Sequence, residues 1–255
     1  MNRTGKQIVK LKYEVNIMEN YQKDYIKDFL GLGDNPVFNK GCTGVDELSL
    51  RLYIGAISFF TIYGLAISTL VAYMTIRWEL SFILILILGL VVPFIGIKIA
   101  LDTDEWFMSF FGYNLVILGL SAITGPVINH YTSGTVVAAF MATCAVSVVL
   151  SIAGILYPRS LESLGGYLFG GLLALVFVRV GQLILVSLGM YQYGFISLVE
   201  YGAAILFSLY IVYDWNRGLE MARTLSNAVK TSLGIYLDII NLFLSLLRLM
   251  GSEDE

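Results

Sequence analysis

Long apolar windows recur along the chain after its first fifty residues. Crossing a bilayer core takes about 20 apolar helical residues, and seven windows are close to that length. None alternates polar and apolar positions, and a bilayer admits only helices or closed barrels. The pattern therefore predicts an all-α membrane protein with seven transmembrane helices, at Leu52–Ile76, Leu80–Ala100, Trp106–Ile128, Thr135–Tyr157, Leu164–Leu188, Phe195–Tyr213 and Thr231–Met250.

Composition agrees with a multi-pass membrane protein. The chain is 57% hydrophobic and 14% charged, a balance far from that of soluble domains. We expect a polar N-terminal tail at 1–50, a seven-helix domain at 51–251 and a short acidic tail at 252–255. No apolar run lies near Met1 behind a basic start, so no cleavable signal peptide is predicted. The net charge of −3 does not favour nucleic acid as a partner.

Basic residues near the ends of the spans predict the orientation, because they collect on the cytoplasmic side. An odd number of spans puts the termini on opposite sides. With the N-terminus in the cytoplasm and the C-terminus outside, the connection from 215 to 230 is cytoplasmic. The cytoplasmic side then holds Lys40, Arg51, Lys98, Arg159, Arg217, Arg223 and Lys230, and the exterior side holds Arg77 and Arg248.

A polar seam runs along the seventh span. A charge at the centre of a spanning helix costs roughly 2.5–3.5 kcal/mol, so such residues normally face a protein interior or a water-filled cavity. The sixth span adds Asp214, which closes it at the cytoplasmic end, and Glu200 near the exterior mouth. Helical spacing places one set of residues on a single face of the seventh span, Gly234, Asp238, Asn241, Ser245 and Arg248.

Two interpretations of the seam stand side by side. Small and polar residues hold membrane helices together, which suffices for Asn241 and Ser245. A carboxylate adds little to packing, so the presence of Asp238 within the span indicates a functional role. Arg248 either snorkels to the interface or is neutralised by Glu200 or Glu79. In the fifth span, Gly166 and Gly170 have the GxxxG spacing of a packing surface.

The end of the chain resembles a known family. The segment ILFSLYIVYD, beginning at Ile205, and the segment SLGIYLDIINLFLSLLRLMG together resemble the C-terminal signature of the transmembrane Bax inhibitor motif (Bax inhibitor and LifeGuard) family. The resemblance is closest to its bacterial, pH-sensitive calcium-leak branch. It covers about the last fifty residues tightly and the seven-span layout loosely. The first fifty residues and the acidic connection Asp102–Glu105 depart from the family pattern.

The resemblance implies a fold and a mechanism. The implied fold has six helices in two three-helix layers around a central C-terminal helix. Asp214 and Asp238 correspond to the family's paired aspartates, which form a pH-responsive latch on a cation pathway. Elementary electrostatics agrees, because two carboxylates in a poorly solvated site cannot both ionise cheaply and would share a proton as a coupled pair.

The residues thus predict a cation channel and no enzyme, and the resemblance implies that the channel is a pH-sensitive leak for calcium. Asp214 and Asp238 are the predicted sensor and gate, and the predicted seam or pathway residues are Glu200, Asn241, Ser245 and Arg248. The expected partners are the lipid bilayer and calcium as the permeant ion, with no cofactor. No metal site is assigned, although the calcium pathway could pass Asp214 and Asp238. The expected location is a prokaryotic cell membrane, or the endoplasmic reticulum in a eukaryote.

Two alternatives remain open beside the channel. An intramembrane aspartyl protease also carries two aspartates on consecutive spans, but its Gly-x-Gly-Asp motif is replaced here by Ile235-Tyr236-Leu237-Asp238. A secondary transporter remains compatible with the layout, although no inverted repeat is evident. A retinal-type receptor needs a lysine within the seventh span, and Lys230 precedes it.

Overall fold

The structure is a computed structural model that describes residues 38–40, 46–189 and 193–251. Seven helical segments in this part are long and apolar enough to cross a membrane, which confirms the predicted number of spans. The elements, in order, are β1 (Phe38–Lys40), β2 (Asp46–Leu48), α2 (Leu50–Thr75), α3 (Phe82–Leu86), the π-helical turn η1 (Ile87–Val91), α4 (Val92–Leu101), α5 (Trp106–Ile128), α6 (Ser133–Leu156), the 3₁₀ turn η2 (Glu162–Leu164), α7 (Gly165–Ser187), α8 (Tyr193–Glu220) and α9 (Leu225–Gly251).

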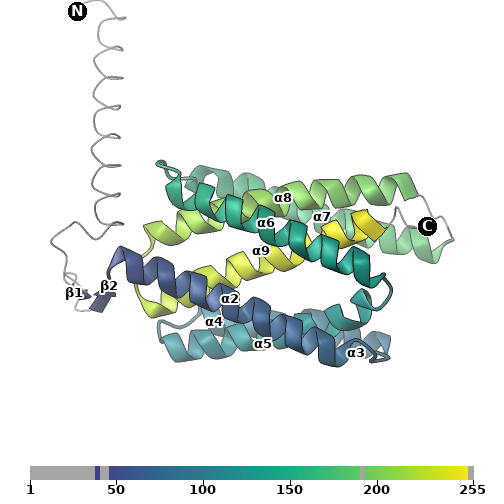
Figure 1. Cartoon of the computed structure of the whole chain (residues 1–255), viewed down its shortest axis with the longest axis horizontal. Coiled ribbons are helices and arrows are strands. Elements are labelled where there is room, and N and C mark those ends of the chain that lie inside the picture. Colours follow the sequence, from purple (N-terminus) through teal and green to yellow (C-terminus); the bar gives the residue numbers. More distant parts are fainter. Residues whose placement is uncertain (1–37, 41–45, 190–192, 252–255) are drawn as a thin grey trace, which may run out of the picture.

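The C-terminal helix α9 occupies the centre of the bundle. The helices from α2 to α5 form one layer, and α6, α7 and α8 form the other (Figure 1). Helix α9 runs between the layers and packs against α2, α5, α6 and α8. The predicted arrangement of two three-helix layers around the last helix is confirmed.

Helices α8 and α9 are both longer than the hydropathy pattern predicted. Helix α8 continues to Glu220 instead of ending at Tyr213, and α9 already begins at Leu225. The predicted connection 215–230 is therefore wrong, because only 221–224 separate the helices. Asn216 explains the extension: its amide donates to the carbonyls of Tyr157 and Arg159, at 3.2 and 3.0 Å, which fixes the last turns of α8 against the α6–α7 connection.

The second span is not one continuous α-helix. Between α3 and α4 the backbone widens into the π turn η1, and Pro93 follows at the start of α4. Proline has no N–H to donate into the preceding turn, and π turns are a common way to accommodate such a break. Hydropathy alone could not predict the interruption, since no polar side chain stands between Phe82 and Ile97.

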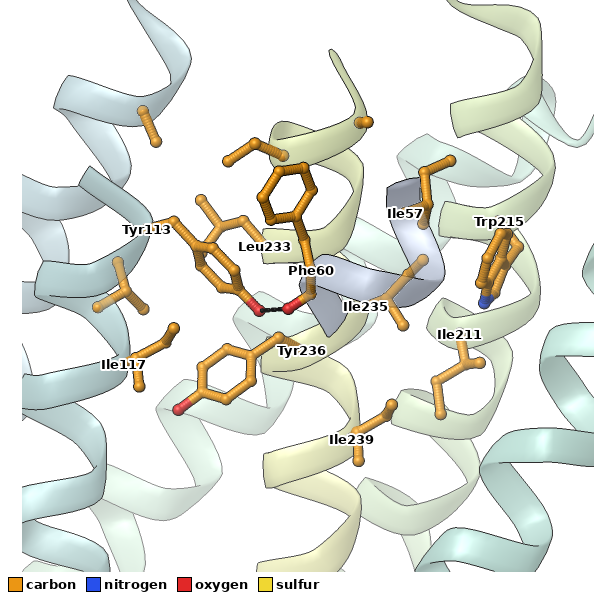
Figure 2. Close-up of a cluster of buried hydrophobic side chains, with 14 of the residues drawn as sticks. Ile57, Phe60, Tyr113, Ile117, Ile211, Trp215, Leu233, Ile235, Tyr236 and Ile239 are labelled. Carbon is orange, nitrogen blue, oxygen red and sulfur yellow. Dashed lines mark hydrogen bonds between the residues drawn. The ribbon is translucent and has the colours of Figure 1, made fainter. Parts of the chain in front are cut away.

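Buried aromatic residues join α9 to the first layer. The rings of Tyr113 and Tyr236 pack edge to face at 5.7 Å, and the Tyr113 hydroxyl donates to the Phe60 carbonyl at 3.0 Å (Figure 2). A side chain at Gly64 would collide with the Tyr113 hydroxyl. On the other side of α9, Trp215 of α8 closes the core. Without a hydrophobic force between helices in lipid, such close packing and hydrogen bonds hold the bundle.

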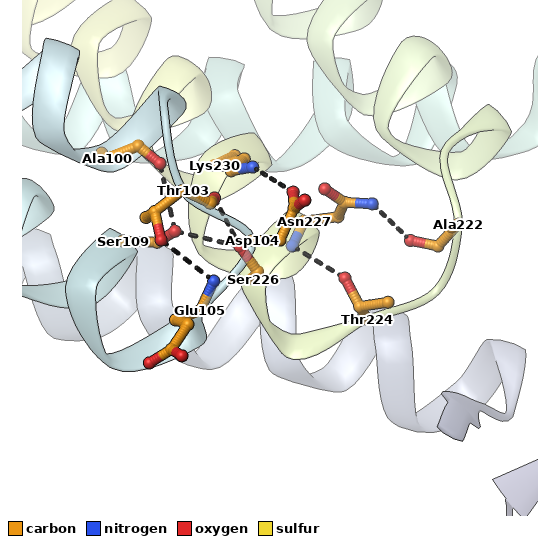
Figure 3. Close-up of polar contacts among 10 residues, drawn as sticks. All are labelled: Ala100, Thr103, Asp104, Glu105, Ser109, Ala222, Thr224, Ser226, Asn227 and Lys230. Atoms are coloured by element: carbon orange, nitrogen blue, oxygen red, sulfur yellow. Dashed lines mark hydrogen bonds and ion pairs between the residues drawn. The ribbon is translucent and has the colours of Figure 1, made fainter. Parts of the chain in front are cut away.

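The beginning of α9 is also tied to the α4–α5 connection (Figure 3). Ser109 and Ser226 share a hydrogen bond of 2.9 Å, and Ser109 also donates to the Ala100 carbonyl. Lys230 pairs with the exposed Asp104 at 3.4 Å. These contacts fix the first two turns of α9 against the α4–α5 connection.

A short antiparallel hairpin, β1–β2, precedes α2 and was not predicted. Its Leu48 N–H donates to the Arg223 carbonyl in the α8–α9 connection at 2.8 Å. The predicted polar tail therefore contains ordered backbone just before the bundle. Most of that tail (1–37 and 41–45) and the acidic end (252–255) lie outside the described residues.

Glycines do create close helix contacts, but not at the predicted positions. Gly166 and Gly170 in α7 have nothing within 4 Å of an added Cβ, so their predicted packing surface is wrong. Instead, α4 and α5 meet at Gly96 and Gly112. A Cβ at Gly112 would lie 2.5 Å from the Gly96 carbonyl oxygen and 2.6 Å from the Ala100 nitrogen. The GxxxG spacing did not predict a contact correctly because, within the part of the chain that the structure describes, α8 is the only long helix that α7 contacts closely.

Alanine substitutions at these glycines should separate the two environments. Gly112→Ala should lower the free energy of unfolding by about 1–3 kcal/mol, because the methyl group meets backbone atoms that cannot move away locally. Gly170→Ala is the matched control and should be neutral or slightly stabilising, since alanine favours a helix over glycine. Melting temperatures in detergent measure both variants, and equal losses would contradict the α4–α5 contact.

Candidate functional site

Two charged clusters lie on the face that α8 and α9 share. The first contains Asp214 and Asp238. Asp214 is half-buried six residues before the end of α8, and its carboxylate lies directly over Gly234 of α9, where an added Cβ would collide with it. Gly234 and Asp238 are one helical turn apart, so they lie on one face of α9. The backbone at Gly234 thus lets the Asp214 carboxylate come close to Asp238.

Asp238 is buried, with 6% of its surface exposed. When both are ionised, the two carboxylates repel each other. Among the described residues, the Asp238 Oδ2 atom finds no hydrogen-bond partner. A buried carboxylate oxygen without a partner is costly, and a second carboxylate raises the cost further. The pair therefore suits a proton or a cation held between the oxygens.

One cation lies near the pair. Arg217, one turn after Asp214 on α8, attracts the Asp214 carboxylate but is itself exposed. An exposed guanidinium is screened by water and offsets a buried charge only weakly. The two aspartates are thus chemically unequal, since Asp214 has a partial counter-charge and Asp238 is enclosed.

The second cluster joins three helices around Glu200 of α8. Both Glu200 oxygens accept hydrogen bonds from Arg179 of α7 at 2.8 Å, in a bidentate pair. Arg248 of α9 approaches the same carboxylate at 3.3 Å. Glu200 is only 2% exposed, whereas the two arginines are 31% and 32% exposed. The predicted contact of Arg248 with Glu200 is confirmed, and the alternative partner Glu79 is exposed instead.

The two clusters lie in opposite halves of the bundle. Fourteen residues separate Glu200 from Asp214, which is about 21 Å along a helix. Between them on α9, the Asn241 amide donates to the Leu237 carbonyl of its own helix at 2.7 Å. Ser245 is fully buried, and its hydroxyl has no partner among the described residues. The seam is thus a continuous polar line with charge at both ends.

Sequence reasoning missed two parts of this arrangement. Arg179 lies in an apolar run of the fifth span, and its bidentate contact could not be predicted without knowing that α7 packs on α8. A second polar line on α9 was also missed. Its Ser232 donates to the Ile57 carbonyl at 2.9 Å, and the hydroxyls of Tyr236 and Ser68 share a hydrogen bond of 2.7 Å. Ser232 and Tyr236 are four residues apart, which is the signal that would have indicated a second buried face.

The carboxylates do not form a metal cage. Within the described ranges, His, Cys, Asp and Glu do not gather in groups of three or more. Resident calcium sites use six to eight oxygen ligands, and two carboxylates supply fewer. The chemistry of the pair therefore suits proton exchange or transient contact with a passing cation.

Comparison with known proteins gives consistent matches. Residues 52–255 match the model of the family described as inhibitor of apoptosis-promoting Bax1. The chain is 26% identical to an uncharacterised membrane protein of Streptococcus pyogenes serotype M1, over 88% of this chain and all of that protein. It is 26% identical to the inner membrane protein YbhL of Escherichia coli K12, over 80% and 93% of the two chains. It is also 36% identical to protein LIFEGUARD 2 of Arabidopsis thaliana over 36% of each chain.

Removing the Glu200 charge should destabilise the bundle. Glu200→Gln leaves two neighbouring arginines without a counter-charge. Breaking a fully buried pair costs about 3–5 kcal/mol, and a smaller loss is expected here because both arginines are partly exposed. Arg179→Gln should cost more than Arg248→Gln, since Arg179 makes the shorter, bidentate contact. Melting in detergent measures each variant.

The double variant and a control complete this test. Glu200→Gln with Arg248→Gln should be less destabilised than the sum of the single changes, because the second change removes an unpaired charge. Glu79→Gln, an exposed carboxylate outside the cluster, should melt like wild type. Strict additivity would show that Glu200 and Arg248 do not interact.

Proposed function

The chain belongs to the family of inhibitors of apoptosis-promoting Bax1, and from this premise we propose that it is a pH-sensitive cation leak channel, permeable to calcium and gated by Asp214 and Asp238. The protein is an integral, multi-pass membrane protein. The proposal rests on the resemblance of the last two helices to the calcium-leak branch of the family and on the geometry of the α8–α9 face.

One observation carries the proposal, the enclosed Asp238 carboxylate beside Asp214. Its Oδ2 atom is buried and finds no partner among the described residues, and the neighbouring Asp214 carboxylate repels it when both are ionised. A residue that served packing alone would be better as Asn or Ser, which carry no charge. The position instead suits a group whose interactions change when a proton binds or leaves.

The pair acts as a latch between α8 and α9. With one proton, a carboxylic acid donates to a carboxylate in a strong charge-assisted hydrogen bond. Loss of that proton leaves two repelling charges, and gain of a second replaces the strong bond by a weaker neutral one. The latch is therefore tightest when the pair holds one proton in total. Because α9 is central, a loosened latch changes its packing against both layers.

The permeant ion follows from the oxygen chemistry and from the resemblance. Carboxylate oxygens favour cations and reject anions, and calcium prefers oxygen ligands. The choice of calcium comes from the resemblance to the bacterial leak branch. At the other end of the seam, Glu200 has both oxygens occupied by arginine. Glu200 and Arg248 can line the pathway only in a state that breaks their ion pair, whereas Asn241 and Ser245 are proposed to line the segment between the two clusters.

The family assignment does not indicate an intramembrane aspartyl protease. The matched family is described by its relation to Bax1 and not by proteolysis. The chain also lacks the Gly-x-Gly-Asp motif at Asp238. A measurement of calcium flux into sealed liposomes separates the two functions, because a protease would not carry calcium across the bilayer.

We further propose that the N-terminus and the α8–α9 connection are cytoplasmic. Glu220→Cys and Glu253→Cys, each made after replacing Cys42 and Cys144 by serine, report the orientation through a thiol reagent that does not cross membranes. In intact cells the reagent should label position 253 and leave position 220 unlabelled, because basic residues gather at the α8–α9 end. The opposite labelling would reverse the orientation.

Calcium flux should depend on pH through the aspartate pair. Wild-type protein in liposomes loaded with a calcium dye should carry calcium, but not chloride, at a rate that changes between mildly acidic and mildly basic buffers. Asp238→Asn and Asp214→Asn keep the side-chain size but abolish the shared proton, so each should lose most of this pH dependence. The double variant should resemble the single ones, since the two groups act as a unit.

Two further variants serve as controls for the flux measurement. Asp102→Asn changes an exposed carboxylate outside the pair and should keep the wild-type pH profile. Gly234→Ala places a methyl group against the Asp214 carboxylate and should weaken the pH dependence without altering either aspartate. Retention of the wild-type profile in both aspartate variants would exclude the pair as the sensor.

A further inference from the structure

A crevice of about 330 Å³ opens between α2 and α6. These helices each pack on α9 but make few contacts with one another, so a gap remains between them with α9 as its floor. The floor is formed by Ile239, Ile240 and Phe243. The volume lies within the range typical of small-molecule sites.

The crevice opens sideways toward the bilayer. Tyr73 on the α2 wall is 76% exposed, and Val137 and Phe140 on the α6 wall are 60% and 47% exposed. Both walls belong to membrane-spanning helices. The medium at the mouth is therefore hydrocarbon, and an occupant can enter from the bilayer without crossing water.

The hydroxyls in the interior of the crevice are already engaged. Four of the five hydroxyl-bearing residues in the lining bond within the protein, and the fifth, Tyr73, is 76% exposed at the mouth. Thr69, Thr124 and Thr143 each donate to a carbonyl one turn earlier in their own helix, at 2.7–2.8 Å. Ser68 shares its hydrogen bond with Tyr236. A stable water needs two to four polar partners, so the lining selects an apolar chain over water or ions.

The rim adds a charge beside this apolar interior. Ile76 lines the crevice at the end of α2, and the next residue, Arg77, is exposed. Trp78 follows and is 52% exposed. Arginine pairs well with phosphate, and tryptophan collects at the level of lipid headgroups. An apolar slot whose last α2 lining residue is followed directly by an arginine and a tryptophan suits one acyl chain and the phosphate of a single phospholipid.

We propose that the α2–α6 crevice binds a phospholipid of the surrounding bilayer. One acyl chain lies along Ile239, Ile240 and Phe243 of α9, and the phosphate pairs with Arg77. The acyl chain contacts Ile239, the residue directly after Asp238, so the bound lipid supports the central helix between α2 and α6. The lipid-binding proposal can be tested separately from the proposed leak, because lipid binding is measured without any ion flux.

Native mass spectrometry of the full-length protein, extracted in mild detergent, tests the proposal. Cys144→Phe fills the crevice from the α6 wall, and Thr69→Phe fills it from the α2 wall. Wild type should retain one more phospholipid than either variant. Val149→Phe is the matched control on α6; Val149 is 65% exposed and does not line the crevice, so this variant should retain the wild-type number.

The headgroup contact has its own measurement. Added phosphatidylglycerol should raise the melting temperature of wild type, and Arg77→Gln should need several-fold more lipid for the same rise. Arg159→Gln, which removes an exposed charge in the α6–α7 connection, should behave like wild type.

Three results would overturn the proposal. The first is that both crevice variants retain the wild-type number of phospholipids while melting as folded proteins. The second is that Val149→Phe loses as many as they do. The third is that the retained molecule has the mass of a detergent or another apolar compound in place of a phospholipid.

Discussion

A charge inside a bilayer must find its partners within the protein, and this constraint organises the whole molecule. Helix α9 carries Asp238 and Arg248, and a position facing lipid would leave both exposed to hydrocarbon. Surrounding α9 with six other spans removes that cost. The central place of the last helix therefore follows from its own polar residues, and the two outer layers can remain almost entirely apolar.

The same constraint selects α8 as the closest partner of α9. Glu200 forms an ion pair with Arg248 near one end of the shared face, and Asp214 lies near Asp238 at the other end. The two ends differ in kind. Glu200 is neutralised by two arginines and fixes three helices together, whereas the two aspartates repel each other whenever both are ionised. One end is thus suited to hold the helices, and the other is suited to release them.

Hydropathy and helical spacing predicted the number of spans, the central seam and the Glu200–Arg248 contact, because these depend on local pattern and on opposite charge. These two patterns did not predict features that depend on which other helix or loop packs alongside. The extension of α8 depends on Asn216 reaching the α6–α7 connection, the close glycines depend on which helices meet, and Arg179 depends on α7 packing against α8. The π turn η1 lies in a run without polar side chains, so hydropathy could not indicate it. Pro93 was the one signal of a break in that run.

The two layers contact each other mainly through α9. Since α2 and α6 barely touch, a shift of the central helix at the aspartate pair is not resisted by direct contact between the layers on that side. Resistance comes instead from Tyr236, bonded to Ser68 on α2, and from whatever fills the space above Ile239. Close-packed interfaces tend to have discrete alternatives and do not deform continuously. A central helix with a buried pair of carboxylates on one face and a lipid-accessible gap on another has the two features that such a switch requires.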